Sequence, residues 1–197
     1  MKAIDLGLPS GLKWADCNIG AEKETDYGLY FQWGDTEGYD DVYHSTWETC
    51  PGNEGNATYN VDSITEWDKA NLNNGVLKPE VDAATVHLGS NWRMPTLDDI
   101  AELYRNTINE LVEIDGVRGR KFTSKSDPSK YIFFPFGGFI TGGTFHHHGV
   151  EFNLWVSSAY PSNSKGACAM CANKSVVCRV PNYRCYAFSV RGVCKNI

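Results

Sequence analysis

The sequence predicts an α+β domain in which two helices lie beside antiparallel sheets with long irregular loops. Short apolar stretches broken by Gly and Pro open the chain, two helical patterns occupy its middle, and alternating strands follow Gly116. Aromatic residues make up 13% of the chain and Gly occurs 19 times, a composition that favours pleated sheets and tight turns. This order of elements is typical of helices packed beside an antiparallel sheet.

The first 75 residues predict short strands and then a surface insertion. Residues 5–34 alternate short apolar stretches with Gly and Pro turns. Residues 38–75 are rich in Asp, Asn, Glu and Gly, and we expect a polar surface insertion there, with short strands at 46–48 and 59–64.

Two helices are expected next. The stretch KPEVDAATVHLG places Pro79 at a helix start and Gly89 at its end. The stretch PTLDDIAELYRNTI offers Thr96 as the N-cap residue, with Asp99 completing a short capping box. One apolar face of this second helix is expected to comprise Ile100, Leu103, Tyr104 and Ile108.

Three apolar segments predict the strands of the second half. Residues 131–143 form an apolar run that ends in glycines, and residues 149–158 and 186–193 alternate with a period of two. The side chains expected on one face are Val150, Phe152, Leu154 and Val156 in the first alternating strand, and Tyr186, Phe188 and Val190 in the second. Four tryptophans are expected in the core because large rings dominate core burial: Trp14, Trp33, Trp92 and Trp155.

Charge and length exclude two classes of partner. The 197-residue chain has a formal net charge of −6, which argues against nonspecific binding of nucleic acid and of anionic membranes. No apolar run reaches the roughly 18 residues of a membrane helix. The stretch MKAIDLGLPSG lacks the apolar core of a signal peptide, so we expect export without such a signal or a chain that starts after one.

Several segments, in the same order, resemble one family. They are DLGLPSGLKWADCNIGAEKETDYGLYFQWGDTEG, DAATVHLGSNWRMPTLDDIAEL, FFPFGGFITGG, LWVSSAY and YAFSVRGV. Together they resemble the Fibrobacter/Bacteroides-type paralogous domain, and WRMPT and F-S-V-R are the most specific pieces. The resemblance implies a single C-type-lectin-like domain over residues 1–197, related in architecture to formylglycine-generating enzymes.

Part of this family resembles the variable proteins of diversity-generating retroelements. In those proteins a hypervariable ligand-binding stretch lies between a W-x-S-S-like strand and the F-S-V-R strand, which corresponds here to residues 160–185. The resemblance implies phage receptor binding or adhesion, and a protein or glycan partner on another cell surface or phage host. We therefore expect an extracellular, cell-surface or virion protein, with no nucleic-acid partner and no membrane insertion.

Five of the seven cysteines lie near the C-terminus, and four interpretations of them remain open. Cys168-x-x-Cys171 has the spacing of a zinc ligand pair, but no second close pair follows. A disulfide is an alternative, and adjacent strands would bring Cys171 near Cys178. A catalytic pair, Cys185 and Cys194, is implied only by the likeness to formylglycine-generating enzymes. The fourth interpretation, which we favour, places most of these cysteines on a variable surface.

The predicted contact surface follows from that fourth interpretation. If Ala167 and Met170 point inward, then Cys168, Ala169 and Cys171 face outward. Tyr160, Tyr183 and Tyr186 are natural anchors, because aromatic side chains give a large contact area at low entropic cost. The predicted ligand-binding residues are Tyr160, Ser162, Ser164, Cys168, Ala169, Cys171, Asn173, Cys178, Val180, Asn182, Tyr183 and Cys185.

No metal and no cofactor is predicted. The triplet His146–His148 is flanked by glycines and is expected in an exposed loop. The acidic residues at 35–41 are expected in a solvated loop, and Val180-Pro181-Asn182 lacks the acidic or amide first ligand of a calcium-dependent sugar site. The sequence therefore predicts a non-enzymatic ligand-binding module with a diversified surface. The alternative is a thiol-dependent oxidase related to formylglycine-generating enzymes.

Overall fold

The computed structural model describes residues 1–195 of the chain. Strands account for 37% of it and helices for 17%. The helices are α1 Val61–Asn71, α2 Ala83–Leu88 and α3 Leu97–Asn106, with single 3₁₀ turns η1 Trp47–Thr49 and η2 Pro79–Val81. The strands are β1 Ala3–Asp5, β2 Lys13–Ala15, β3 Tyr30–Phe31, β4 Leu72–Asn73, β5 Val76–Leu77, β6 Trp92–Arg93, β7 Thr107–Ile114, β8 Val117–Ser124, β9 Tyr131–Pro135, β10 Phe139–Thr141, β11 Thr144–His146, β12 Glu151–Ala159, β13 Gly166–Asn173, β14 Val177–Tyr183, β15 Phe188–Ser189 and β16 Val193–Cys194.

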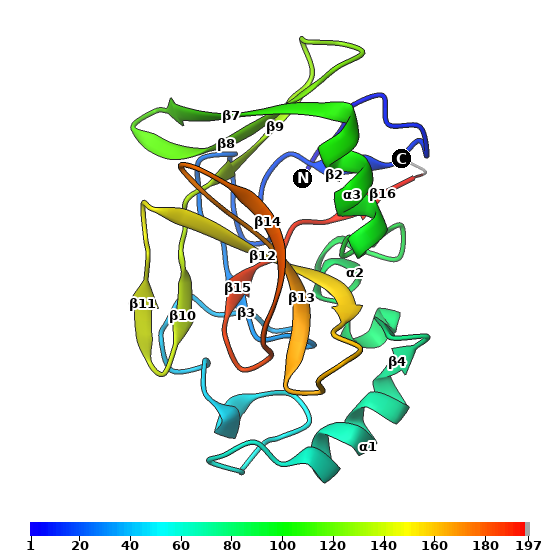
Figure 1. Ribbon diagram of the computed structural model, residues 1–197, viewed down its shortest axis with the longest axis vertical. Coiled ribbons are helices and arrows are strands. Elements are labelled where there is room, and N and C mark those ends of the chain that lie inside the picture. Colours follow the sequence, from blue (N-terminus) through cyan, green and yellow to red (C-terminus); the bar gives the residue numbers. More distant parts are fainter. Residues whose placement is uncertain (196–197) are drawn as a thin grey trace.

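The strands are distributed over four sheets. The largest sheet has the order β14-β13-β12-β15-β3, and β5 and β4 extend it beside β12. A three-stranded sheet, β7-β8-β9, lies at one end of the molecule, while α1 lies at the other end (Figure 1). The sheet β1-β2-β16-β6 joins the two ends of the chain, because β16 pairs with β2.

The predicted fold class is wrong. Residues 1–195 contain three α-helices where two were expected, and strand residues outnumber helical residues by more than two to one. The largest sheet is also mixed, because β12 pairs with β15 in parallel through Leu154 and Ser189. A C-type-lectin-like α+β fold with two helices beside antiparallel sheets therefore does not describe this molecule. The division into a single domain stays a prediction.

The insertion accounts for the extra helix. Residues 46–48 and 59–64, expected as strands, lie in η1 and at the start of α1. The Asn60 side chain accepts hydrogen bonds from the backbone N–H groups of Asp62 and Ser63, which is an N-cap. Ile64 is buried and Trp67 packs against Trp33, so α1 has an inward face. The mostly polar composition of the segment did not indicate that face.

The two predicted helices form at the predicted sites. Thr96 and Asp99 form the expected capping box of α3, and Gly89 ends α2. Pro79 begins a 3₁₀ turn instead, and the side chain of Asp82 then caps α2. The predicted apolar face of α3 is correct for Ile100 and Leu103, which are buried, and wrong for Tyr104 and Ile108, which are exposed. Ile108 lies beyond the end of the helix at Asn106, in β7.

Two core clusters lie on opposite faces of the largest sheet. Phe152, Leu154 and Val156 point to one face, where they meet α3 and β7–β9, while Trp155 points to the other, where it stacks on Phe188 at 4.2 Å. Burial of all four tryptophans expected in the core is confirmed. Tyr186, Phe188 and Val190 share the second cluster as predicted, whereas Val150 is exposed.

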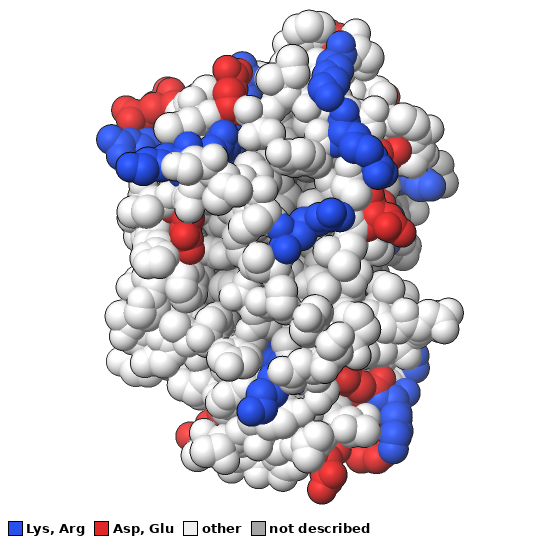
Figure 2. All heavy atoms as spheres, viewed as in Figure 1, with Lys and Arg blue, Asp and Glu red and all other residues white. Residues whose placement is uncertain are grey.

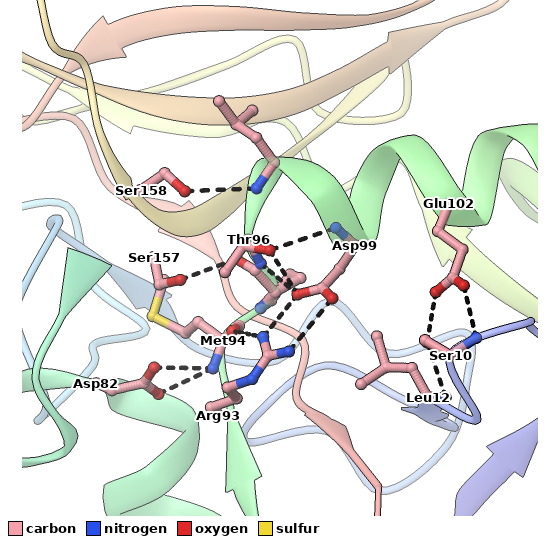
Figure 3. A network of polar contacts seen from close by, with 12 residues as sticks. Ser10, Leu12, Asp82, Arg93, Met94, Thr96, Asp99, Glu102, Ser157 and Ser158 are labelled. Atoms are coloured by element: carbon pink, nitrogen blue, oxygen red, sulfur yellow. Dashed lines mark hydrogen bonds and ion pairs between the residues drawn. The ribbon is translucent and has the colours of Figure 1, made fainter. Parts of the chain in front are cut away.

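A polar network fixes the segment WRMPT against the sheet (Figure 3). The Asp82 carboxylate accepts the Met94 N–H at 2.9 and 3.0 Å. Arg93 donates to both carboxylate oxygens of Asp99, at 2.6 and 3.2 Å, as expected of a structural ion pair. The backbone N–H of Ser157 reaches the Pro95 carbonyl at 2.8 Å, so this network ties the start of α3 to β12.

Candidate functional site

The predicted variable stretch, residues 160–185, forms a hairpin at the edge of the largest sheet. A loop over 160–165 leads into β13, a turn at 174–176 leads into β14, and residues 184–187 return toward β15. β13 lies between β12 and β14, and β14 is the outermost strand. The stretch therefore combines a central strand, an edge strand and two loops, which differ in exposure.

Three of the predicted contact residues are buried, and their prediction as surface residues is wrong. Cys168, Ala169 and Cys185 have relative exposures of 5%, 0% and 4%. Both faces of β13 are covered: Cys168 and Met170 face the cluster under α3, while Ala167 and Ala169 face the cluster around Trp155. The side chains on β13 are small because close-packed neighbours on both faces leave little room. The prediction took these small residues as a sign of an exposed strand, which is why it was wrong.

A second group of predicted residues is half-buried. Cys171 and Cys178 are directly opposite each other in the β13–β14 pairing, and the Cys178 thiol contacts the Cys171 carbonyl oxygen at 3.5 Å. Val180 and Asn182 lie on the same side of β14 as Cys178. Asn173 shapes the turn, since its side-chain oxygen accepts the N–H groups of residues 175 and 176. These residues belong mainly to the scaffold.

The remaining predicted residues reach the surface. Ser162 and Tyr183 are exposed, and Tyr160 and Ser164 are partly exposed. At the end of β14 the surface is indented by a hollow of about 270 Å³, which we call the tyrosine hollow. It is lined by Tyr160, Asn163, Gly166, Pro181, Asn182, Tyr183 and Tyr186.

The insertion packs directly against this end of the hairpin, which the sequence did not predict. The Tyr59 hydroxyl forms a hydrogen bond with the Ser164 hydroxyl, and the Lys165 ammonium lies 4.9 Å from the centre of the Tyr59 ring. Gln32 donates to the carbonyl oxygens of Thr46 and Cys185, at 2.8 and 2.9 Å, and so bridges the two segments. The insertion and the hairpin therefore form one surface.

A buried ion pair strengthens this junction. Arg184 has a relative exposure of 1%, and its guanidinium donates to both carboxylate oxygens of Asp68 in α1, at 2.5 and 3.0 Å. The guanidinium also lies over the Trp33 ring, 4.5 Å from its centre. A two-point hydrogen-bonded pair fixes orientation as well as distance, so α1 is held in one position relative to the hairpin.

A continuous row of partly exposed rings runs across this composite surface, and we call it the aromatic row. It contains Tyr59, Trp47, Tyr183, Tyr186, Phe139 and His146. The centroid distances between successive rings are 5.3, 6.1, 5.6, 5.9 and 5.2 Å. The turn after β14 lies beside the cyan segment that contains η1 (Figure 1). Trp47 and Tyr59 were not predicted, although large rings in an otherwise polar insertion are a usable signal.

Charged side chains are sparse in the middle of this face. Figure 2 shows most Lys, Arg, Asp and Glu toward the two ends of the molecule, with one long basic side chain across the middle and acidic groups to either side of it. None of the residues that line the tyrosine hollow is charged. Two cations lie close by, Lys165 and Arg184, and both are engaged, by the Tyr59 ring and by Asp68.

The cysteines do not form an activated thiol centre. Burial is the leading cause that raises the pKa of all seven thiols, and it raises that of Cys185 to about 12. Cys194 lies in β16, in a different sheet from the hairpin that Cys185 follows. A thiolate is the reactive form, so this environment disfavours nucleophilic chemistry at neutral pH.

The histidine triplet and the acidic segment have local structural partners. His146 stacks on Phe139, His147 lies 3.0 Å from a Glu151 oxygen, and His148 packs edge-on against Tyr27. The Asp35 carboxylate accepts the N–H groups of residues 37 and 38 within a turn. Across residues 1–195, no three His, Cys, Asp or Glu side chains are grouped closely enough to hold a metal ion.

Comparisons with protein-family models, with curated proteins and with solved structures found no match for this chain. No helix in residues 1–195 is long and apolar enough to cross a membrane. Any assignment of function must therefore be argued from the surface described above.

Proposed function

We propose that the protein is a non-enzymatic binding module whose recognition surface combines residues 160–185 with the docked insertion. The observation that carries the proposal is the aromatic row, which is partly exposed and borders the tyrosine hollow. Tyr and Trp side chains dominate the energetics of recognition surfaces, because they bury much area and lose few rotamers. The ligand is a protein or glycan on another cell or on a phage host, and the protein acts outside the cell, at a cell surface or on a virion.

Rigidity supports this proposal. Ring contacts hold Tyr183 between Trp47 and Tyr186, and the Asp68–Arg184 ion pair fixes the insertion beneath them. A surface that is ordered before binding loses less conformational entropy when the ligand arrives. The thiol-dependent oxidase finds no comparable support, because burial raises the pKa of every cysteine.

We further propose that the recognition surface is diversified, as in the retroelement-encoded proteins that the sequence resembles. Residues 160–185 divide into positions that the core requires and positions that it does not. The exposed positions, which can vary without loss of packing, are Pro161, Ser162, Asn163, Lys174, Ser175, Val176, Arg179, Pro181 and Tyr183. Sequences of this gene from several isolates should differ at these positions and keep Ala167, Ala169, Met170 and Arg184; changes spread evenly over the chain would argue against diversification.

The binding function is tested by flow cytometry of the labelled protein on a panel of whole bacterial cells. We expect the wild type to bind a subset of the panel, and Tyr183→Ala to reduce that binding at least tenfold. Val86→Ala is the control, because Val86 is similarly exposed, at 51%, but lies on α2, outside both residues 160–185 and the insertion. Equal binding by the wild type and Tyr183→Ala, or binding to no cell, would overturn the proposed surface.

Thiol labelling distinguishes the enzyme alternative. Iodoacetamide should react with each cysteine of the native protein more slowly than with free cysteine, because the raised pKa values leave little thiolate at pH 7. Rapid labelling of Cys185 or Cys194, followed by mass spectrometry, would instead favour the oxidase.

A further inference from the structure

Resting on the proposed function, we propose that the tyrosine hollow and its flanking rings bind an uncharged carbohydrate. One sugar ring stacks on Tyr183, and neighbouring hydroxyl groups of the sugar reach the amides that line the hollow.

The rings offer a stacking platform. Tyr183 is 48% exposed and is held edge-on by Tyr186, while Trp47 tilts toward it from the insertion. The face of an aromatic ring carries negative potential, and the C–H groups on one side of a pyranose carry a small positive charge. A fixed, exposed tyrosine face is therefore a suitable partner for a sugar ring.

Three polar groups of the hollow have no partner within the described residues, whereas the Asn182 amide nitrogen donates to the Cys171 sulfur. The Asn163 side-chain oxygen accepts the Lys165 N–H at 2.9 Å, but its amide nitrogen has no partner among the described residues. The hydroxyl groups of Tyr160 and Tyr183 likewise have no hydrogen-bond partner within residues 1–195. Sugar hydroxyl groups both donate and accept hydrogen bonds, so they can bond to amide and phenol groups that have no partner within the described residues.

The charge and size of the site favour a neutral sugar over a charged one. No charged residue lines the hollow, and the nearest cations, Lys165 and Arg184, already contact Tyr59 and Asp68. The hollow of about 270 Å³ lies just below the range of roughly 300–1,000 Å³ typical of sites for drug-sized ligands. It therefore accommodates one ring, and an extended chain would continue along the aromatic row.

The first experiment measures direct binding of defined sugars by saturation-transfer NMR and calorimetry. The probes are neutral trisaccharides of glucose, mannose and N-acetylglucosamine, together with lactose and its sialylated counterpart. We expect transfer to the C–H face of one ring of a neutral probe, and a tenfold to hundredfold weaker affinity in Tyr183→Ala, because that variant removes the ring on which the sugar stacks; this range corresponds to about 1.4–2.8 kcal/mol. Tyr183→Phe should retain most of the affinity because it keeps the ring, and Val86→Ala should match the wild type. Preference for the sialylated probe alone, or binding of none of the probes, would overturn the proposal.

The second experiment separates this proposal from the proposed function. Cells that bind the protein are treated with periodate, which destroys vicinal diols of glycans, or with a protease. Loss of binding after periodate, and not after protease, supports a carbohydrate ligand. Loss after protease alone would show that the carbohydrate assignment is wrong while the binding function stands, and absence of binding to untreated cells would remove both.

Discussion

Two arginines, Arg184 and Arg179, differ in their burial and in the contacts of their side chains. Arg184 is buried against Trp33 and pairs with Asp68, whereas Arg179 on β14 is exposed and its side chain makes no hydrogen bond within the described chain. Asp68 retains contact with water, since its side chain is 22% exposed, while the Arg184 side chain is only 1% exposed. Loss of one partner therefore has unequal consequences, because the charge left behind is desolvated in one case and partly solvated in the other.

This asymmetry predicts the order of stability in three variants. Asp68→Leu should destabilise the protein by about 3–5 kcal/mol, because it leaves a buried guanidinium unpaired. Arg184→Met should cost less, about 2 kcal/mol, because the remaining carboxylate can turn to water. Urea denaturation measures both, with Arg179→Met as the control that should stay within about 0.5 kcal/mol of the wild type. Equal effects of all three variants would show that the ion pair does not hold the insertion.

Asp99 gives the protein a pH dependence. Burial by itself would raise the pKa of this carboxyl, but hydrogen bonds from Arg93 and the Thr96 N–H outweigh it and hold the pKa below its usual value. A carboxyl whose pKa is lowered by folding stabilises the native state above its unfolded pKa of about 3.9, and this contribution is lost as the pH falls through the folded pKa.

Asp99→Asn should therefore destabilise the protein at pH 7, by about 1–3 kcal/mol, and the difference from the wild type should shrink below about pH 4. Thermal unfolding followed by circular dichroism between pH 3 and pH 7 measures this. Asp98→Asn in the same helical turn is the control, since the Asp98 side chain makes no hydrogen bond within residues 1–195. A difference in melting temperature between Asp99→Asn and the wild type that stayed constant down to pH 3 would show that the ionised Asp99 carboxylate does not stabilise the native state.

At the scale of the elements, the β13–β14 pairing sets the register of the hairpin. Cys171 lies directly opposite Cys178 in this pairing, so these two thiols report on the register of the hairpin. Residues directly opposite in antiparallel strands have Cα atoms about 4.5–5.5 Å apart, within the range of roughly 4.4–6.8 Å that a disulfide spans.

Mild oxidation with diamide should therefore join Cys171 to Cys178 before any other pair. Mass spectrometry of proteolytic peptides identifies the linked pair, and Cys178→Ser should abolish it. Cys168, buried on the opposite side of β13, is the internal control and should stay reduced. A first disulfide that includes Cys168 would mean that the register of the hairpin is different.

At the scale of the whole molecule, the insertion packs against the edge of the largest sheet, and the two form one structural unit. Trp67 of α1 packs against Trp33, and the rings of Trp47 and Tyr59 continue the row that begins on the hairpin. Gly52 has a φ of +81°, and a Cβ there would lie 2.6 Å from Trp67 Cβ, so close approach of the chain depends on this glycine. Loss of the Trp67 contact should thus disturb residues far from it in sequence.

Trp67→Ala should lower hydrogen-exchange protection in residues 46–71 and in the loop over 160–165 together, while β7–β9 stay unchanged. The physical reason is that a half-buried tryptophan anchors α1, and its removal should cost about 2 kcal/mol of local stability, below the 3–5 kcal/mol of a fully buried ring. Val61→Ala, an exposed position of the same helix, is the control. Loss of protection confined to α1 would argue against a single composite surface.

The sequence by itself determined the features that depend on near neighbours. The Thr96–Asp99 capping box, the end of α2 at Gly89 and the alternation of β12 were all predictable, because caps and strand faces are set by residues a few positions apart. The exposure of Tyr183 was also expected, from the family resemblance and from the use of aromatic side chains as anchors, and this residue is 48% exposed.

Only the tertiary structure decided the fold class, the helix within the insertion and the burial of Cys168, Ala169 and Cys185. Whether a small side chain is exposed depends on what covers its strand, and β13 is covered on both faces by segments distant in sequence. The docking of Trp47 and Tyr59 beside the hairpin has the same origin: contacts across about 100 residues arise from the packing of the whole chain, which no local pattern encodes.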